Sequence, residues 1–428
     1  MDVKREPLAK RKPIESWEIG SKMQKAMGID GKIMIKQIKG GAIQFSIATN
    51  DFPKLLPYLD TVPGFDRGLH VKNQEDKGRF TELTVESFFK LRLLAHLFFN
   101  SADEKKDTNA IADLIEELTG IKAEYSQIKR FFPALKDFRW DPDIFMMFHQ
   151  EAMMCSQVRK LVQAHTIVFL EQHAAEFKPK RAIKMPIDGK IEPRAEALPI
   201  VVEVVSQDCL VAARELLKEN QSVCVLNMAN QFHPGGGAGQ GAGAQEEDLY
   251  RRTDLAKSLH PADYQEKDAG FGEFNVLYSS GVTVFRAGQA EGYAVFEPKD
   301  RFKVNVVSSA AYNLGKQGPT YKNPESPEYE EGMKRKIRGQ LRAAQEHGDR
   351  ALVLSAFGCG AFHNNPAKVA QFYFDVMSEI EFEAAFDIVQ FAIIPNPAAK
   401  ENDNFVHFQK AFQGKVFTRE ELKAPALM

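Results

Sequence analysis

The sequence predicts an α/β fold in its C-terminal part, preceded by a mainly helical N-terminal region. From residue 200 onward, apolar runs without alternation are separated by helical patterns, which is typical of a largely parallel or mixed sheet covered on both faces. Before residue 170, apolar residues recur mainly at helical spacing. A proline-rich segment of mixed charge separates the two patterns, so we expect domains at residues 1–178 and 179–428.

Composition and charge narrow the class of protein. The 428 residues include 56 Lys and Arg against 58 Asp and Glu, which gives a net charge of −2. A protein that binds polyanions over its whole surface would be far more basic, so we expect no direct nucleic-acid binding, although a local phosphate site stays open. The sequence contains no run of about 18 apolar residues, so we expect no membrane-spanning helix. The four cysteines form no CxxC pair, which favours a reducing, cytoplasmic compartment.

The N-terminal region opens with a small β element and continues with helices. Residues 31–48 alternate around Gly40 and Gly41, which predicts a hairpin, and a short helix is expected at 52–59. Residues 83–101 carry apolar residues at helical spacing, with Thr84 as the expected N-cap. Further helical patterns occupy 109–118, 125–135 and 142–173.

The C-terminal region alternates between the two kinds of element. Expected strands lie at 200–208, 222–230, 282–288, 293–298, 302–311, 350–358 and 386–395. Expected helices lie at 209–220, 246–259, 330–347 and 365–380. In such sheets ligands bind in the loops that follow the carboxyl ends of strands, so those loops are the first place to look for a site.

The first of these loops is rich in glycine and ends in carboxylates. Six glycines lie between Pro234 and Ala244, and Gln245, Glu246 and Glu247 then begin a helical pattern. Glycine lets the backbone approach a ligand closely, and consecutive N–H groups can converge on an anion. The helix dipole favours ionised Glu, whereas a general acid needs the opposite bias from burial or a bound anion. We therefore expect the two carboxyl groups to differ in role if their surroundings differ.

The second loop, 355–366, places Gly358 and Gly360 on either side of Cys359, before a helix that starts near Pro366. Its N–H groups would hold a second phosphate, and Phe362 would stack on a sugar or base. No partnered histidine accompanies Cys359, so a nucleophilic cysteine is not favoured.

Three motifs in order carry a family resemblance. The string VLNMANQFHPGGGAGQGAGAQEEDLYRRTDL resembles the signature of the poly(ADP-ribose) glycohydrolase family, GGG and QEE separated by seven residues, in its microbial form. The resemblance continues through LYSSGVTVFRAG and LVLSAFGCGAFHNNPAKVAQFYFDVM, and covers about residues 201–394. It implies a macrodomain, a three-layer α/β/α sandwich with a mixed sheet that binds ADP-ribose.

The resemblance also implies roles for individual residues. Glu247 would be the catalytic acid/base, and Glu246 would fix the ribose hydroxyls with the help of Asn230. Gln245 would shape the loop. The remaining substrate-binding residues would approach the diphosphate and the ribose: Gly235, Gly236, Gly237, Gly358, Cys359, Gly360, Ala361 and Phe362.

The implied chemistry is hydrolysis of a ribosyl bond, with ADP-ribose or poly(ADP-ribose) on modified proteins as the partner. Two alternatives stay open: removal of a single ADP-ribose from a residue such as arginine, with the N-terminal region recognising the protein, or a non-catalytic ADP-ribose reader. No cofactor is expected, and no metal, since no His, Asp or Cys cluster has ligand spacing. His363 and the run Asp248, Arg251 and Arg252 depart from the family pattern and would alter the rim of the site.

Overall fold

The computed structural model divides the chain into two compact units. Unit 1 comprises Met1–His173, Gly239–Ala242 and Gln289–Val295. Unit 2 comprises Ala174–Ala238, Gly243–Gly288 and Phe296–Met428. The structure describes residues 16–37, 43–62, 65, 67, 71–85, 93, 140, 142, 145–146, 155–187, 200–220, 222–265, 270–315, 320–321, 323–382, 384–412 and 416–417.

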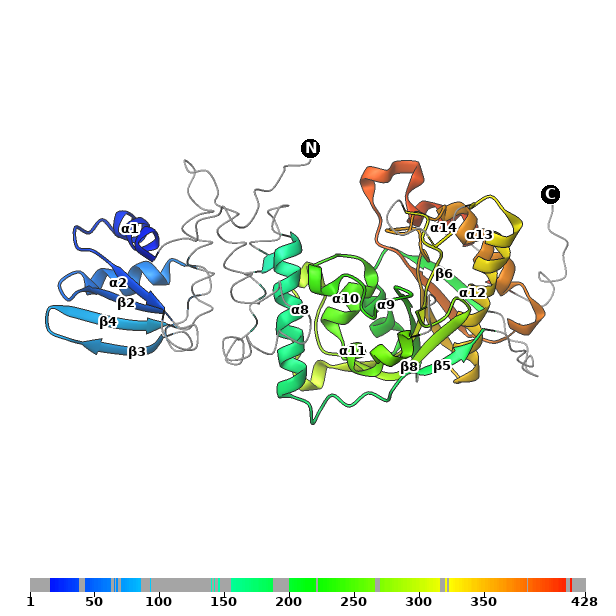
Figure 1. The fold of residues 1–428 in the computed structure, drawn as a ribbon, viewed down its shortest axis with the longest axis horizontal. Coiled ribbons are helices and arrows are strands. Elements are labelled where there is room, and N and C mark those ends of the chain that lie inside the picture. Colours follow the sequence, from blue (N-terminus) through cyan, green and yellow to red (C-terminus); the bar gives the residue numbers. More distant parts are fainter. Residues whose placement is uncertain are drawn as a thin grey trace. The chain divides into compact units, whose positions relative to one another are not determined.

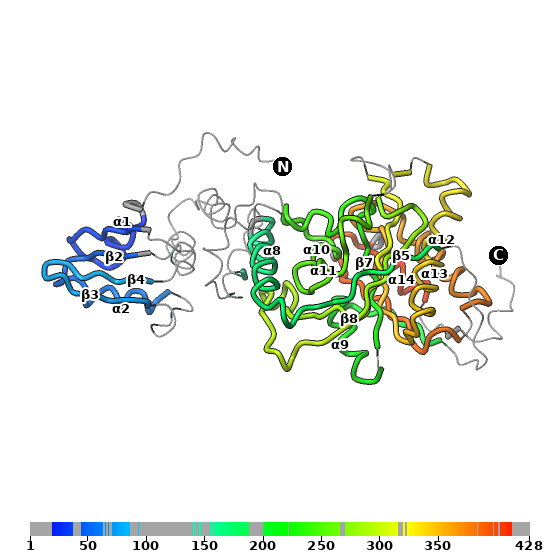
Figure 2. The backbone as a smooth tube through the Cα atoms, turned by 60° about the horizontal axis from the view of Figure 1, so that its bottom comes forward, coloured from blue at the N-terminus to red at the C-terminus, as the bar shows by residue number. Residues whose placement is uncertain are grey.

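Unit 1 contains a four-stranded antiparallel sheet with two helices packed on it (Figures 1 and 2). The strand order is β1-β2-β4-β3, and Ile35, Phe45, Ile47 and Leu83 share a buried core with the helices. Its elements are α1 Ser16–Met27, β1 Met34–Gln37, β2 Ile43–Ala48, α2 Phe52–Asp60, β3 Val71–Asp76, β4 Phe80–Val85 and α8 Cys155–Gln172. The expected hairpin and the short helix that follows it are confirmed.

The prediction of a helix starting at Thr84 is wrong where the structure tests it. Leu83, Thr84 and Val85 belong to β4 and pair with β2 in register, Leu83 opposite Phe45 and Val85 opposite Ile43. Leu83 and Val85 are two residues apart and both fully buried, which is the spacing of one face of a strand. Of the other expected N-terminal helices, 155–172 is helical, whereas 109–118 and 125–135 lie outside the described residues.

Unit 2 is built on an eight-stranded mixed sheet of order β12-β6-β11-β10-β7-β9-β8-β5. The five strands from β6 to β9 run parallel, while β12, β8 and β5 are antiparallel to their neighbours. The strands are β5 Ile183–Pro186, β6 Ile200–Val205, β7 Val223–Met228, β8 Asn275–Val284, β9 Phe302–Ser309, β10 Ala351–Leu354, β11 Ile388–Ala392 and β12 Val416–Phe417. The central strands carry buried apolar side chains on both faces of the sheet.

Helices cover both faces of this sheet and make it a three-layer sandwich (Figure 1). The α-helices are α9 Cys209–Leu216, α10 Gln245–Arg252, α11 Leu255–Ser258, α12 Pro327–Glu346, α13 Pro366–Met377 and α14 Asn404–Phe412. Short 3-10 helices lie at Ala238–Gln240, Pro261–Tyr264, Gln289–Glu291, Pro298–Asp300, Ile380–Phe382 and Pro397–Asn402. In the part of the chain that is described, no helix combines the length and the apolar character needed to cross a membrane.

Two separate hydrophobic cores lie on the two faces. One contains Leu210 of α9 and Leu249 of α10, and the other contains Met333 of α12 and Phe408 of α14. Because β7, β9 and β10 are parallel neighbours, the loops that follow them leave the sheet at the same edge. The two glycine-containing loops of the sequence therefore meet there.

Two details differ from the sequence prediction. The segment 293–298 forms no strand, although it is rich in apolar residues. The helix expected over 246–259 is two helices, because Thr253 takes an extended backbone conformation after α10 and bridges to Val284 of β8. The Thr253 hydroxyl donates to Leu249 O at 2.7 Å, which closes the end of α10.

Candidate active site

Gln245 anchors the start of α10 to the end of β7. Its Oε1 accepts the N–H of Met228 at 2.9 Å, and its Nε2 donates to Leu226 O at 2.6 Å. Nε2 also lies 3.5 Å from the sulfur of Cys209 at the start of α9. The side chain thus bonds backbone groups at the end of β7 as a neighbouring strand would, and this fixes the positions of Glu246 and Glu247.

Glu246 is 3% exposed and uses both carboxyl oxygens to hold the glycine-rich loop. Oε2 accepts the N–H of Asn230 at 2.6 Å, and Oε1 accepts the N–H of Gly235 at 3.0 Å. The Asn230 side chain in turn accepts the N–H groups of Phe232 and His233 at 2.8 and 3.0 Å. The loop is therefore a folded structure closed around one carboxyl group.

Glu247 is 7% exposed and is bonded differently. Its Oε1 accepts the N–H of Gly237 at 2.8 Å. Its Oε2 is buried and has no hydrogen-bond partner among the residues that the structure describes. An unpartnered buried carboxyl oxygen is costly, so a group that persists in this state is a candidate for contact with a ligand.

Gly236 is the point at which the two carboxyl groups come together. A methyl group added to its α-carbon would lie 2.5 Å from Glu247 Oε1 and 3.0 Å from Glu246 Oε2, and its φ of +50° favours glycine. Gly235 has a φ of +80° and packs on Tyr250 of α10, 2.4 Å from where its own Cβ would stand. The first two glycines of the GGG run are thus required by close approach to α10.

The surroundings of Glu246 favour its protonated form. Burial raises the pKa of Glu246 from 4.5 to about 8, and the neighbouring charge of Glu247 raises it further, against the opposing backbone hydrogen bonds from Asn230 and Gly235. The neutral form of Glu246 is therefore favoured near pH 7. The sequence led us to expect such a bias on a residue that acts as general acid.

The loop after β10 is held by Asn364. Its Nδ2 donates to Tyr312 O at 2.8 Å and to Gly358 O at 2.9 Å, and its Oδ1 accepts the hydroxyl of Tyr329 at 2.5 Å. Gly358 has a φ of +73° and packs against Ala311, 2.5 Å from where its own Cβ would stand. Within the described residues, no hydrogen bond uses the N–H groups of the segment 360–362, which leaves them available for an anion.

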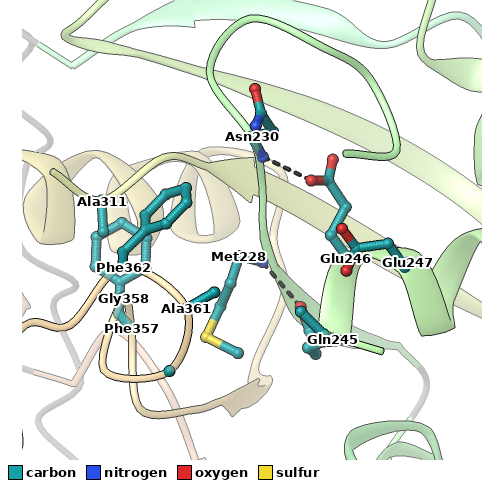
Figure 3. A pocket seen from close by; sticks show the side chains of 12 residues that line it. Met228, Asn230, Gln245, Glu246, Glu247, Ala311, Phe357, Gly358, Ala361 and Phe362 are labelled. Atoms are coloured by element: carbon teal, nitrogen blue, oxygen red, sulfur yellow. Dashed lines mark hydrogen bonds between the residues drawn. The ribbon is translucent and has the colours of Figure 1, made fainter. Parts of the chain in front are cut away.

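A cavity of about 210 Å³ lies between the two loops (Figure 3). Figure 3 shows Phe362 and Phe357 on one side, Glu246, Glu247 and Gln245 on the other, and Met228 between them. The lining residues are Met228, Asn230, Ala244, Gln245, Glu246, Glu247, Ala311, Phe357, Gly358, Gly360, Ala361 and Phe362. An elongated ligand with an anionic centre, a sugar and an aromatic group would match this lining.

The structure brings most of the expected site residues to this cavity. Asn230, Gln245, both glutamates, Gly358, Gly360, Ala361 and Phe362 line it. Gly235, Gly236 and Gly237 do not line it but hold or adjoin the two carboxyl groups. Cys359 is not in the lining either: its thiol lies 3.6 Å from Phe357 O, and burial raises its pKa, which fits a structural rather than a nucleophilic thiol.

Sequence reasoning missed four lining residues, Met228, Ala244, Ala311 and Phe357. Met228 ends β7, and Ala311 and Phe357 follow β9 and β10, so the rule on carboxyl ends of strands was the signal that could have found them. Small and apolar residues carry no chemical signature of their own, so the sequence indicated the GGG and QEE motifs and not these four residues.

The expectation that Arg251 and Arg252 alter the rim of the site is wrong. They are 0% and 2% exposed. Arg252 Nη1 bridges Asp208 at 2.7 Å and Asp248 at 2.8 Å, so this side chain ties α10 to the N-cap of α9. The run after QEE is a structural anchor of the helix that carries the carboxyl pair.

Known proteins resemble parts of the chain. A family model described as microbial-type PARG, catalytic domain, matches residues 149–287. The poly(ADP-ribose) glycohydrolase of Thermomonospora curvata is 27% identical with a TM-score of 0.50, over 59% of this chain and 99% of that one. The poly(ADP-ribose) glycohydrolase of Deinococcus radiodurans, solved with ADP-ribose, is 28% identical with a TM-score of 0.43, over 50% and 84% of the two chains. No curated protein sequence matches significantly.

The predicted three-layer fold of unit 2 is confirmed by the sheet and its two helical layers, and by the T. curvata structure, which aligns over nearly its whole length. The family-model match covers the loop after β7 and the whole of α10, where the carboxyl pair lies. The chain is therefore similar to poly(ADP-ribose) glycohydrolases, and its residues 149–287 match the catalytic domain of the microbial type.

Proposed function

We propose that the chain is a hydrolase that cleaves the ribosyl bonds of ADP-ribose modifications, with poly(ADP-ribose) as substrate class and ADP-ribose as product. The observation that carries the proposal is the pair of buried carboxyl groups at one wall of the cavity, of which Glu247 alone keeps an oxygen without a partner among the described residues. Over 59% of its length the chain resembles a structure named poly(ADP-ribose) glycohydrolase at 27% identity, which supports the same reaction.

Glu247 is the general acid and base in this proposal. A ribosyl bond breaks through a transition state with oxocarbenium character, and protonation of the leaving oxygen lowers the barrier. The free Oε2 of Glu247 gives the proton to the leaving oxygen, and the same carboxylate then takes a proton from the attacking water. The N–H of Gly237 on Oε1 fixes the orientation of the group throughout.

Glu246 binds the ribose. Both of its oxygens are engaged by backbone N–H groups, so it is less suited to exchange protons with a leaving group than to hold a fixed position. Because its raised pKa favours the neutral form near pH 7, it offers a proton to a ribose hydroxyl. Asn230 holds the loop against the same sugar.

The loop after β10 holds the diphosphate. The N–H groups of Gly360, Ala361 and Phe362 face no acceptor among the described residues, and such consecutive amides favour a phosphate. The Phe362 ring lies across the cavity from the carboxyl pair (Figure 3), where it packs on ribose.

The partner is then ADP-ribose or its polymer on modified proteins. The four free cysteines fit a reducing, cytoplasmic compartment.

The test compares Glu247→Gln with Glu246→Gln on automodified polymer and on mono-ADP-ribosylated arginine and serine proteins. Glu247→Gln should lose turnover by at least about 10²–10⁴-fold and keep its affinity for ADP-ribose, because only proton transfer is removed. Glu246→Gln should mainly raise KM, because the ribose contact is altered.

Glu215→Gln is the matched control, since Glu215 is an exposed residue of α9 that pairs with Lys218. It should behave as the unchanged protein. Turnover that persists in Glu247→Gln would contradict the assignment of the acid/base. Release from arginine or serine proteins but not from polymer would move the substrate class to single ADP-ribose units, and binding of ADP-ribose without any release would leave a reader.

A further inference from the structure

Met228 is a cavity residue to which the proposed function gives no role. It is the last residue of β7, and its backbone N–H is fixed by Gln245 at 2.9 Å. Figure 3 shows its thioether in the middle of the cavity, with Phe362 and Ala361 on one side and Gln245 on the other. Any ligand that spans from the carboxyl pair to the loop after β10 must pass this side chain.

Met228 is also the methionine of unit 2 that an oxidant would reach first. It is partly exposed, whereas Met185, Met333 and Met377 are 8%, 0% and 1% exposed; these four are the methionines of unit 2 that the structure describes. Oxidation of a thioether requires access to the sulfur, so the three buried residues are protected by packing.

We propose that Met228 is an oxidation site whose sulfoxide form weakens binding of ADP-ribose, an inference that rests on the proposed function. The sulfur attacks one oxygen of a hydroperoxide, the O–O bond breaks, and the other oxygen leaves as water or an alcohol after taking up a proton. Sulfur loses two electrons and the peroxide gains them. A methionine sulfoxide reductase with a thiol donor reverses the step.

Among the described lining residues, the side chains that could donate to the new oxygen lie at the polar wall, where Asn230 and Glu246 contact the ligand in the proposed function. Phe362, Phe357 and Ala311 present carbon, and the amide of Gln245 is already engaged by Leu226 O and by the N–H of Met228. The S=O dipole therefore either stays unpaired, which is unfavourable, or takes an N–H from the loop after β10. In the second case it competes with the diphosphate for the same donor, so both outcomes lower affinity.

The experiment measures ADP-ribose affinity of the full chain by calorimetry before and after mild treatment with hydrogen peroxide, and again after sulfoxide reductase. Mass spectrometry follows the oxidation of Met228. Affinity should fall by about tenfold or more on conversion of Met228, the effect of leaving one buried polar group unpaired, and should return with the reductase. Reversal in the unchanged protein makes the result independent of any variant.

Met228→Leu separates Met228 from other oxidisable groups, since leucine has a similar volume and no sulfur. Whatever its starting affinity, this variant should keep it after peroxide. An equal loss in Met228→Leu would assign the effect to another group, such as Cys359, and overturn the inference. Unchanged affinity after full conversion of Met228 would do the same. If the untreated protein fails to bind ADP-ribose, the proposed function and the inference both fall.

Discussion

Glu246 and Glu247 follow each other in the sequence, yet the structure gives them different contacts. Glu246 has two backbone donors and a pKa of about 8, while Glu247 has one donor and one free oxygen. The difference arises because the two side chains contact different parts of the glycine-rich loop, Glu246 the N–H groups of Asn230 and Gly235 and Glu247 that of Gly237. At the residue scale, the two adjacent carboxyl groups are suited to different tasks, because the N–H groups of the loop bind both oxygens of one and a single oxygen of the other.

The raised pKa of Glu246 makes stability depend on pH. In the unfolded chain this carboxyl group ionises near 4.5, whereas in the folded chain it stays protonated to about 8. The folded state therefore binds more protons between these values, and the free energy of unfolding falls as pH rises from about 5 to about 8. Glu246→Gln should remove most of this pH dependence, which is on the order of a few kcal/mol in the free energy of unfolding between about pH 5 and pH 8.

Denaturant unfolding at several pH values measures this slope, and the comparison does not depend on the absolute stability of the variant. Glu215→Gln, at an exposed position, serves as control. Equal slopes in the unchanged protein and Glu246→Gln would show that Glu246 ionises normally in the folded state.

Gly236 is the residue at which a single methyl group should be felt most. Gly236→Ala would place a carbon 2.5 Å from Glu247 Oε1 and would strain a backbone with φ of +50°. Displacement of the carboxyl pair by about 1 Å should lower kcat/KM by up to about 100-fold. Gly239→Ala is the matched control in the same loop, because nothing lies within 4 Å of its added Cβ. Steady-state kinetics that rank the two variants in the reverse order would contradict this geometry.

At the scale of elements, α10 is a helix of eight residues fixed at both ends by buried polar groups. Gln245 ties its start to β7, and Arg252 ties its end to Asp208 and Asp248. So short a helix has little stability of its own, so these tertiary anchors determine where it lies. The position of the proposed catalytic carboxyl group is thus set by Gln245 at the cavity wall and by the Arg252 bridge, whose residues do not line the cavity.

Loss of the Arg252 anchor should therefore be strongly destabilising. Arg252→Gln leaves two largely buried carboxylates without their cation, and we expect a loss of about 3 kcal/mol in the free energy of unfolding. Arg181→Gln removes an exposed partner, 62% accessible, from Asp263, and should cost less than about 1 kcal/mol. Equal losses in the two variants by denaturant unfolding would show that the buried bridge has no special role.

The elements of unit 2 were largely predictable, since β6, β7, β9, β10 and β11 are rich in apolar residues and the GGG and QEE motifs mark the loop. What could not be read was decided by tertiary contacts. Leu83 to Val85 became a strand because β2 lies beside them, and Thr253 broke a helix because β8 pairs with it. Burial of Arg252 was equally hidden, because a pair of arginines after a helix start reads as a solvated surface.

At the scale of the whole molecule, the family match begins at residue 149, inside the region expected to be accessory. We expect a fragment of residues 149–428 to hydrolyse free polymer with a kcat/KM within about threefold of the full chain, and to differ from it mainly in KM on modified proteins. Parallel assays on both substrates check this. Loss of hydrolysis of free polymer by a folded fragment would show that residues 1–148 contribute to catalysis itself.

Net charge fits the same picture. A value of −2 over 428 residues gives no general attraction to a polyanion, so a polymer must be recognised by the cavity and its rim rather than by the field of the molecule. In the proposed function the loop after β10 supplies amides instead of lysines for this purpose, whereas amides of the loop after β7 are bonded to Glu246 and Glu247.

The measurement that bears most directly on the central claim is a crystal structure of Glu247→Gln with ADP-ribose bound. The account predicts that the side-chain amide of residue 247 lies within hydrogen-bond reach, about 2.6–3.2 Å, of the anomeric oxygen, with the diphosphate on the N–H groups of the loop after β10. An anomeric centre more than about 6 Å from that side chain, twice the reach of a hydrogen bond, would contradict it.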